Sequence, residues 1–286
     1  MKNFFAQTGK ALAYFATYMG AQLAASVGAS FIFSMVVGYR AAANGQKLTY
    51  DESVANTAQL VSGNIGYILI ANVIIALAAY LIVTKIRKHK FTEEISLKKI
   101  SPKTLLVTLM ATVGSIFFLN YGMDVLPLPE DLVEATVNGN QQLLNLPIWQ
   151  GILATSIMVP IMEEIVFRGF VFSRLDRVMN SWVAAIITSI LFGLIHGQII
   201  WIFWAAAMGF VMNALRIKTG SLLPGIILHV TNNSFSTFKS ATGFQIPAPS
   251  IVLVIIGAIL LVISFILLKK EDNDRDTEIE VITVNA

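Results

Sequence analysis

The chain has 286 residues, of which 56% are hydrophobic and only 13% are charged, and its mean hydropathy is +0.71. This composition excludes an ordinary soluble domain and is typical of polytopic membrane proteins. The net charge of +3 does not indicate nucleic-acid binding, because the basic residues gather beside apolar segments, where anionic headgroups attract them. Since the chain has no cysteine, disulfides, thiol catalysis and thiolate metal ligands are excluded.

Windows of about 20 apolar residues predict transmembrane helices, because that length of helix crosses the hydrocarbon core. Eight such windows follow one another along the chain, so we expect an all-α, polytopic transmembrane helix bundle of about eight spans. The turns between the fifth, sixth and seventh windows are short, and the boundaries there are the least defined. The windows cover residues 11–38, 60–84, 103–121, 148–171, 180–197, 199–215, 220–240 and 249–268.

The charges of the connections predict how the bundle is oriented. The segment 85–103 is rich in lysine and arginine, whereas the next connection carries Asp124, Glu130, Asp131 and Glu134. Because basic loops stay in the cytoplasm, we expect a multi-pass protein of the cell membrane with this basic loop and both termini cytoplasmic. The basic residues that fall on the opposite side are Arg40, Lys47 and Lys239.

Charged residues interrupt the apolar run from about Pro147 to Val171, where Glu163, Glu164 and Arg168 stand. An ionised group at bilayer depth costs several kcal/mol unless a partner or a polar cavity receives it, so these residues are functional candidates. Glu164 and Arg168 are four residues apart and share a helix face, where they can form an ion pair. Glu163 is rotated by about 100° on the same helix and can face another partner.

Two histidines also lie in apolar windows, each in a motif with helical spacing. His196 follows Phe192 by four residues, and His229 precedes Asn233 by four. A carboxylate, two imidazoles and an amide from three helices would suit the activation of a water molecule. The structural alternative is that these groups only link helices, as buried ion pairs and intramembrane hydrogen bonds often do.

The three motifs occur together and in the same order as in the CAAX protease and bacteriocin-processing (CPBP, or Abi) family of intramembrane endopeptidases, which the segment 147–238 resembles. The resemblance implies that Glu163 and His196 hold and deprotonate the attacking water. It also implies that His229 and Asn233 stabilise the oxyanion. Arg168 would hold the charge of Glu164, and this pair would shape the electrostatic field at Glu163.

The resemblance leaves two catalytic types open, a glutamate mechanism without a cofactor and a metal-dependent one. In a metal-dependent enzyme, Glu163, His196 and His229 would be the three protein ligands of a catalytic zinc. Asparagine is a poor zinc ligand but a good oxyanion donor, and the chain has no His-Glu-x-x-His motif. We therefore favour the metal-independent type.

The apolar windows predict N-terminal transmembrane helices over 1–146, with the basic loop 85–103, and the resemblance implies a catalytic core over 147–240. A last transmembrane helix over 241–268 and an acidic mobile tail over 269–286 would follow. The expected partners are the lipid bilayer and a membrane-inserted or lipidated peptide substrate, with no nucleic acid; the oligomeric state is left open. The alternative function is a catalytically idle membrane scaffold, or an immunity or regulatory protein acting on a partner membrane protein. A transporter would show repeats or paired broken helices, which the sequence lacks.

Overall fold

The computed structural model describes residues 2–144 and 146–268. Within these two ranges the chain forms helices, turns and loops but no strand, which confirms the all-α class. The acidic tail expected over 269–286 lies outside the described residues.

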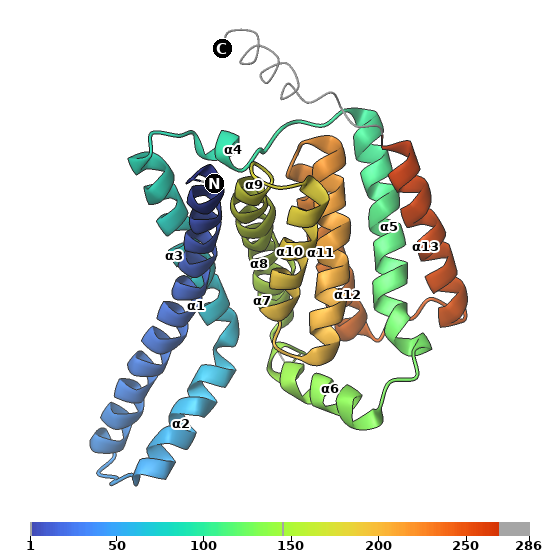
Figure 1. Ribbon diagram of the computed structural model, residues 1–286. Helices are drawn as coiled ribbons and strands as arrows, with labels where there is room; N and C mark the ends of the chain where they lie inside the picture. The colour runs from blue at the N-terminus through green and yellow to red at the C-terminus, as the bar shows by residue number, and fades with distance from the viewer. Residues whose placement is uncertain (1, 145, 269–286) are drawn as a thin grey trace.

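The helices follow the chain as a bundle of long segments with short connections (Figure 1). In chain order they are α1 (Lys2–Ala43), α2 (Tyr50–Gly63), α3 (Ile65–Ile86), α4 (Phe91–Glu94), α5 (Pro102–Val125), α6 (Glu130–Leu144), α7 (Ile148–Gln150), η1 (Gly151–Met158), α8 (Val159–Glu164), η2 (Ile165–Val171), α9 (Phe172–Leu175), α10 (Ser181–Leu194), α11 (Ile199–Thr219), α12 (Leu223–Thr242) and α13 (Ser250–Leu267).

Every window expected to span the membrane contains a helix, and six helical segments are long and apolar enough to cross it. The chain is therefore a multi-pass membrane protein. The other two expected spans differ from a standard transmembrane helix. α10 has 14 residues, about 21 Å at 1.5 Å per residue, which is shorter than the hydrocarbon core. α12 has 20 residues but carries the polar groups of the candidate site. The six are Lys2–Ala43, Ile65–Ile86, Pro102–Val125, Ile148–Leu175, Ile199–Thr219 and Ser250–Leu267.

The first span is longer than the expected 11–38. α1 has 42 residues, about 63 Å at 1.5 Å per residue, and with α2 it forms a hairpin that projects past α6 (Figure 1). The sequence windows missed α2, which begins with a capping box. The backbone and hydroxyl of Thr49 donate to the Glu52 carboxylate at 2.8 and 2.9 Å and hold the pKa of Glu52 below its ordinary value.

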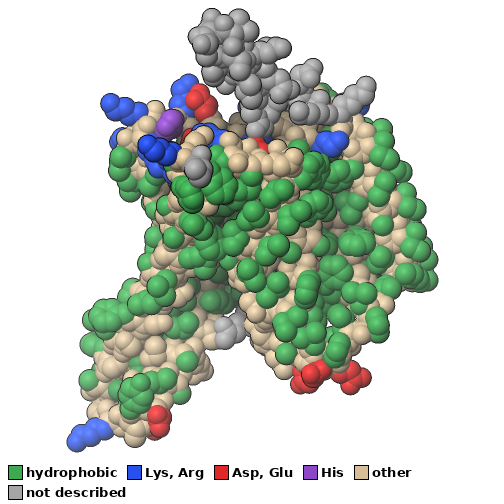
Figure 2. Space-filling view, viewed as in Figure 1, with side chains coloured by type: hydrophobic (Ala, Val, Ile, Leu, Met, Phe, Trp, Pro, Cys, Tyr) green, Lys and Arg blue, Asp and Glu red, His purple; other side chains and the backbone are tan. Residues whose placement is uncertain are grey.

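A second missed helix, α6, lies across one end of the bundle, beneath α7 and α11 (Figure 1). Its first turn carries Glu130 and Asp131, and acidic side chains mark that end in the space-filling view, whereas lysines and arginines cluster at the opposite end (Figure 2). The two ends therefore differ in charge as the connections predicted.

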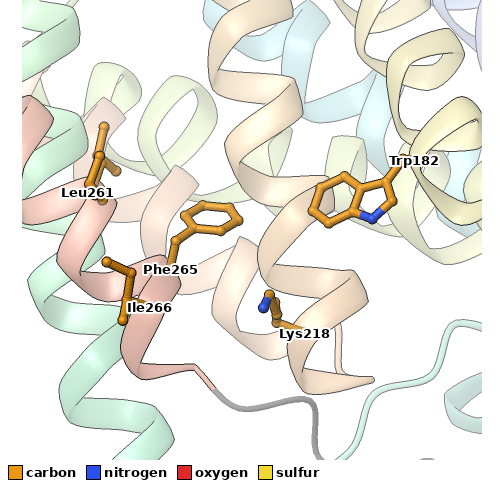
Figure 3. A pocket seen from close by; sticks show the side chains of 6 residues that line it. Trp182, Lys218, Leu261, Phe265 and Ile266 are labelled. Carbon is orange, nitrogen blue, oxygen red and sulfur yellow. The ribbon is translucent and has the colours of Figure 1, made fainter.

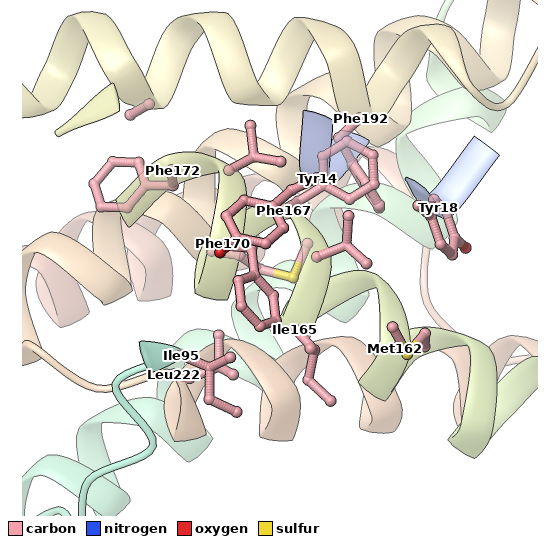
Figure 4. Close-up of a cluster of buried hydrophobic side chains, with 14 of the residues drawn as sticks. Tyr14, Tyr18, Ile95, Met162, Ile165, Phe167, Phe170, Phe172, Phe192 and Leu222 are labelled. Atoms are coloured by element: carbon pink, nitrogen blue, oxygen red, sulfur yellow. The ribbon is translucent and has the colours of Figure 1, made fainter. Parts of the chain in front are cut away.

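Buried aromatic side chains pack α1 and α3 against the segment Ile148–Leu175 (Figure 4). The Phe170 ring of η2 packs against Tyr14 of α1 and Tyr80 of α3, with ring centroids 4.5 and 4.6 Å away. The Tyr80 hydroxyl donates to the backbone oxygen of Tyr14 at 2.6 Å. Because buried aromatic rings contribute much of a core's apolar area, the N-terminal helices are part of the same core as the candidate site.

The basic connection between α3 and α5 is also attached to this segment. Glu94 of α4 is buried and forms an ion pair with Arg174 of α9. Gly169 of η2 has no side chain, and a Cβ there would lie 2.9 Å from the Ile95 side chain. The close approach of loop and helix therefore depends on glycine at this position.

Candidate active site

The segment Ile148–Leu175 carries the carboxylates on a short α-helix between two wider, π-helical stretches. α8 ends with Glu163 and Glu164, and η1 and η2 flank it. Such π-helical turns are rare and occur often at functional sites, since the extra residue turns side chains away from the regular helix faces. The unusual backbone therefore occurs in and next to the segment that carries the intramembrane charges Glu163, Glu164 and Arg168.

Glu164 and Arg168 form the ion pair that their spacing predicts. The carboxylate Oε1 accepts a hydrogen bond from the guanidinium Nη1 at 2.8 Å, and both side chains are fully buried. The guanidinium also lies 4.4 Å from the centroid of the Phe192 ring of α10. Burying a charge is costly unless it is paired, and Arg168 is paired with a carboxylate and an aromatic face.

His229 of α12 lies between the two glutamates. Its Nδ1 is 3.0 Å from Glu164 Oε1, and its Nε2 is 3.6 Å from Glu163 Oε2. The helices can meet this closely because α12 has glycine at position 225, where a Cβ would lie 2.7 Å from Glu164 Oε2. Glu164 therefore orients an imidazole as well as Arg168, a contact that helical spacing within one span could not predict.

Phe192 lies at the centre of the motif residues. Its ring centroid is 4.9 Å from that of His196, 5.6 Å from that of His229 and 5.1 Å from that of Phe167. His196 follows the end of α10, and its Nδ1 is 2.8 Å from the backbone oxygen of Phe192. The four-residue spacing thus places the imidazole against the last turn of its own helix, with Nε2 left for another partner.

The structure adds a contact to the expected arrangement. Glu163 and His196 were expected to hold a water together, and the histidine that Glu163 faces directly, at 3.6 Å, is His229. His196 makes its hydrogen bond to Phe192 of its own helix, and the described ion pairs and hydrogen bonds include none between His196 and Glu163. α10 ends after 14 residues, so the position of His196 depends on the turn that follows.

Asn233 contacts the segment that carries the glutamates. Its Nδ2 donates to the backbone oxygen of Thr155 in η1 at 3.1 Å. The neighbouring Asn232 is buried, and its Oδ1 accepts from Asn120 Nδ2 of α5 at 3.1 Å. The sequence analysis missed Asn120, although a polar residue in an apolar span could have indicated it.

The side chains that the metal-dependent alternative requires as zinc ligands do not come together at one point. Glu163 and His229 approach each other, but among the described side chains no group of three or more His, Asp or Glu is arranged to hold a metal ion. The expected zinc ligands Glu163, His196 and His229 therefore do not fit a three-ligand site, and we derive no step through a metal.

A surface groove lies away from these residues, between the start of α10, the end of α11 and α13 (Figure 3). It contains none of the predicted site residues. Its lining is mainly apolar, with Lys218 at one side; the lining residues are Trp182, Lys218, Leu261, Val262, Phe265 and Ile266.

Comparison with known proteins bears on the same part of the chain. Residues 145–235 match the family described as "Type II CAAX prenyl endopeptidase Rce1-like". The "Putative membrane peptidase YdiL" of Bacillus subtilis (strain 168) is 34% identical over 84 residues, which are 29% of this chain and 34% of YdiL. The "UPF0177 protein YxdF" of Lactococcus lactis subsp. lactis (strain IL1403) is 28% identical over 130 residues, 43% of this chain and 72% of YxdF.

The similarity to YdiL covers about a third of that protein's length. No solved structure matches the chain. The matched range 145–235 includes the glutamates and Arg168, the Phe-His motif and the His-Asn motif. This range and these curated relatives support the resemblance of the chain to the CAAX protease and bacteriocin-processing family.

Proposed function

We propose that the protein is an intramembrane endopeptidase that hydrolyses peptide bonds in membrane-inserted or lipidated peptides, with Glu163 as the general base. The observation that carries the proposal is the buried contact between Glu163 and His229, 3.6 Å apart. A carboxylate beside an imidazole in a site shielded from bulk water is a combination that can accept and pass on protons.

The division of labour between the two glutamates supports this role. Arg168 is paired with Glu164, so Glu163 is not held in an ion pair with the guanidinium and its carboxylate stays available to a water molecule. In the proposed reaction Glu163 takes a proton from the water, the water oxygen bonds to the substrate carbonyl carbon, and the carbonyl oxygen receives the electron pair. When the C–N bond breaks, Glu163 returns the proton to the leaving nitrogen.

The other motif residues come from two further parts of the bundle. Phe192 lies in α10 and His196 just after its end, while His229 and Asn233 lie in α12. We assign His196 to holding the water with Glu163, and His229 and Asn233 to the oxyanion, as the family resemblance implies. Hydrogen-bond donors at a developing oxyanion contribute strongly to the rate of acyl transfer.

The burial of the site residues supports this substrate class. Glu163, Glu164 and His229 are buried in a bundle that exposes many large hydrophobic side chains, which suits a peptide that enters from the bilayer or is held there by a lipid. The family match to a prenyl endopeptidase supports lipidated peptides as one form of this substrate. The glutamate mechanism needs no cofactor.

The decisive experiment compares peptides released by cells that carry wild type, Glu163→Gln or Glu134→Gln, by mass spectrometry of membrane and medium. Glu163→Gln keeps the size of the side chain but removes its basicity, so cleavage products should disappear. Glu134→Gln changes an exposed acid on α6 and should leave them unchanged. If the three peptide profiles coincide and Glu163→Gln still rescues the phenotype of cells that lack the protein, the chain acts as a membrane scaffold and the proposal is wrong.

A further inference from the structure

The helix α12, which carries His229 and Asn233, is hydrogen-bonded to η1 at two positions one turn apart. Asn233 Nδ2 donates to the backbone oxygen of Thr155 at 3.1 Å, and the hydroxyls of Thr237 and Ser156 lie 2.8 Å apart. An asparagine amide has two N–H groups, and the bond to Thr155 uses one of them. This face of α12 is thus attached to η1 while Asn233 keeps an N–H for the oxyanion.

The neighbouring face of α12 is hydrogen-bonded to a single side chain of α5, Asn120. Asn120 Nδ2 donates to the Oδ1 of the buried Asn232 at 3.1 Å. Asn120 Oδ1 accepts from the hydroxyl of Ser236, one turn further along α12, at 2.7 Å. Lys239 Nζ donates to the backbone oxygen of Asn120 at 3.4 Å. The Asn120 amide therefore joins two successive turns of α12, one through its donor and one through its acceptor.

Two contacts on successive turns fix both the depth and the rotation of a helix. Consecutive residues of a helix point about 100° apart, so the bond of Asn232 to α5 directs Asn233 towards η1. His229 lies one turn before Asn233 and shares its face. The same rotation brings the His229 imidazole to 3.0 Å from Glu164 and 3.6 Å from Glu163. The contact at Asn120 and the meeting of the motif residues thus depend on one orientation of α12.

Packing alone does not require an amide at position 120. An apolar side chain would pack α5 against α12 without the cost of placing a polar group in an apolar span. Apolar contacts tolerate small rotations and shifts of a helix, whereas a donor and an acceptor on one amide are both satisfied at one register only. A single buried asparagine fixes the register of a coiled coil for the same reason.

We propose that Asn120 is a positioning residue for peptide hydrolysis, whose amide sets the rotation and depth of α12 and thereby holds His229 and Asn233 at Glu163. The inference rests on the proposed endopeptidase function. Asn120 acts through α12 and not on the reacting atoms, so its loss should slow the chemical step and leave substrate binding unchanged. α5 thereby contributes to the geometry of the site although it carries none of the three motifs.

The test uses the full chain, purified in detergent, as wild type, Asn120→Leu, the double variant Asn120→Leu/Asn232→Leu, Tyr80→Phe and Glu163→Gln. Tyr80→Phe is the matched control, because the Tyr80 hydroxyl also bonds one helix to another, at 2.6 Å from the backbone oxygen of Tyr14, but joins α3 to α1. The substrate is the solubilised membrane fraction of cells that lack the chain, titrated over concentration. Initial rates of peptide release are measured by mass spectrometry below every melting temperature and normalised to folded protein.

Asn120→Leu should lower the maximal rate about 10- to 100-fold, the range for a small misplacement of catalytic groups, at an unchanged half-saturating substrate concentration. Its melting temperature should fall, because Asn232 is left without its partner. In the double variant both amides are gone and Ser236 can donate within its own helix, so the melting temperature should recover while the rate stays low. Tyr80→Phe should lose stability and keep the wild-type rate.

Three results would overturn the inference. They are a wild-type rate for Asn120→Leu, a rate that recovers together with the melting temperature in the double variant, and an equal loss of rate in Tyr80→Phe. Each would show that Asn120 only links two helices. If Glu163→Gln cleaves as wild type does, the proposed function itself fails, which distinguishes that outcome from failure of the role of Asn120.

Discussion

Glu164 and His229 are hydrogen-bonded between two separate helices, with 3.0 Å between the carboxylate Oε1 and the imidazole Nδ1. The same oxygen accepts from Arg168 Nη1 at 2.8 Å. One carboxylate oxygen thus orients the guanidinium and the imidazole together and directs His229 Nε2 towards Glu163. The Glu164–Arg168 ion pair and His229 are therefore joined in one hydrogen-bond network, so a change in one of them alters the position of the others.

Removing the guanidinium should destabilise the fold. Arg168→Met leaves Glu164 as an unpaired buried charge, and breaking a buried pair in this way costs about 3–5 kcal/mol. Chemical unfolding in detergent would measure the loss. Lys90→Met is the control, because the Lys90–Glu93 pair is highly exposed and such pairs contribute less than about 1 kcal/mol. Equal losses for the two variants would contradict a structural role of Arg168.

Gly225→Ala should reduce activity through Glu164. The new Cβ would lie 2.7 Å from Glu164 Oε2, so the carboxylate must move and its hydrogen bond to His229 lengthens. A misplacement of this kind lowers the cleavage rate by about 10- to 100-fold. Gly28→Ala is the matched helical control, since nothing lies within 4 Å of its Cβ, and it should retain full activity. Peptide release is measured for both variants and normalised to the amount of folded protein. Equal release by Gly225→Ala and Gly28→Ala would contradict the prediction.

Phe192→Leu should weaken both stability and catalysis. The flat ring contacts Arg168, His196 and His229 together, and leucine removes the aromatic face on which the buried guanidinium rests. A desolvated cation–π contact contributes about 2 kcal/mol, so the unfolding free energy should fall by a similar amount, together with the cleavage rate. The exposed Phe244 serves as control, because Phe244→Leu changes a surface contact. Wild-type cleavage by Phe192→Leu would show that the ring does not position the histidines.

Chelation should leave cleavage unchanged. The donor atoms of Glu163, His196 and His229 do not form a three-ligand set, and the proposed base acts directly on water. Peptide release is measured after dialysis against 1,10-phenanthroline, with a zinc metalloprotease treated in parallel to verify removal of metal. Activity that disappears with chelation and returns with added zinc would establish the metal-dependent alternative.

The basic and acidic ends of the bundle should face opposite sides of the membrane, the basic end in the cytoplasm. The cysteine-free chain permits single-cysteine labelling without background. In intact cells a membrane-impermeant maleimide should label Glu134→Cys but label Lys88→Cys only after the membrane is broken. The reverse pattern would invert the assigned orientation and place the termini outside.

Local features of the sequence predicted the class of this protein and much of its framework. Apolar windows located a helix at each expected span, because the membrane imposes a length and a hydrophobicity on every crossing segment. The spacing of Glu164 and Arg168 predicted their ion pair, because residues four apart share a helix face. The short, amphipathic α6 was missed, since it lies across the bundle end and needs no long apolar run.

By itself, the sequence determined an all-α membrane bundle, its charge asymmetry and three polar motifs, since each depends on hydrophobicity or spacing along one segment. Only the tertiary structure decided which motif residues meet. It placed His229 of α12 opposite Glu163 and hydrogen-bonded the same imidazole to Glu164. Contacts between helices depend on the depth, tilt and close approach of whole segments, here set by Gly225 and by the short α10, and helical spacing within one segment carries no information about them.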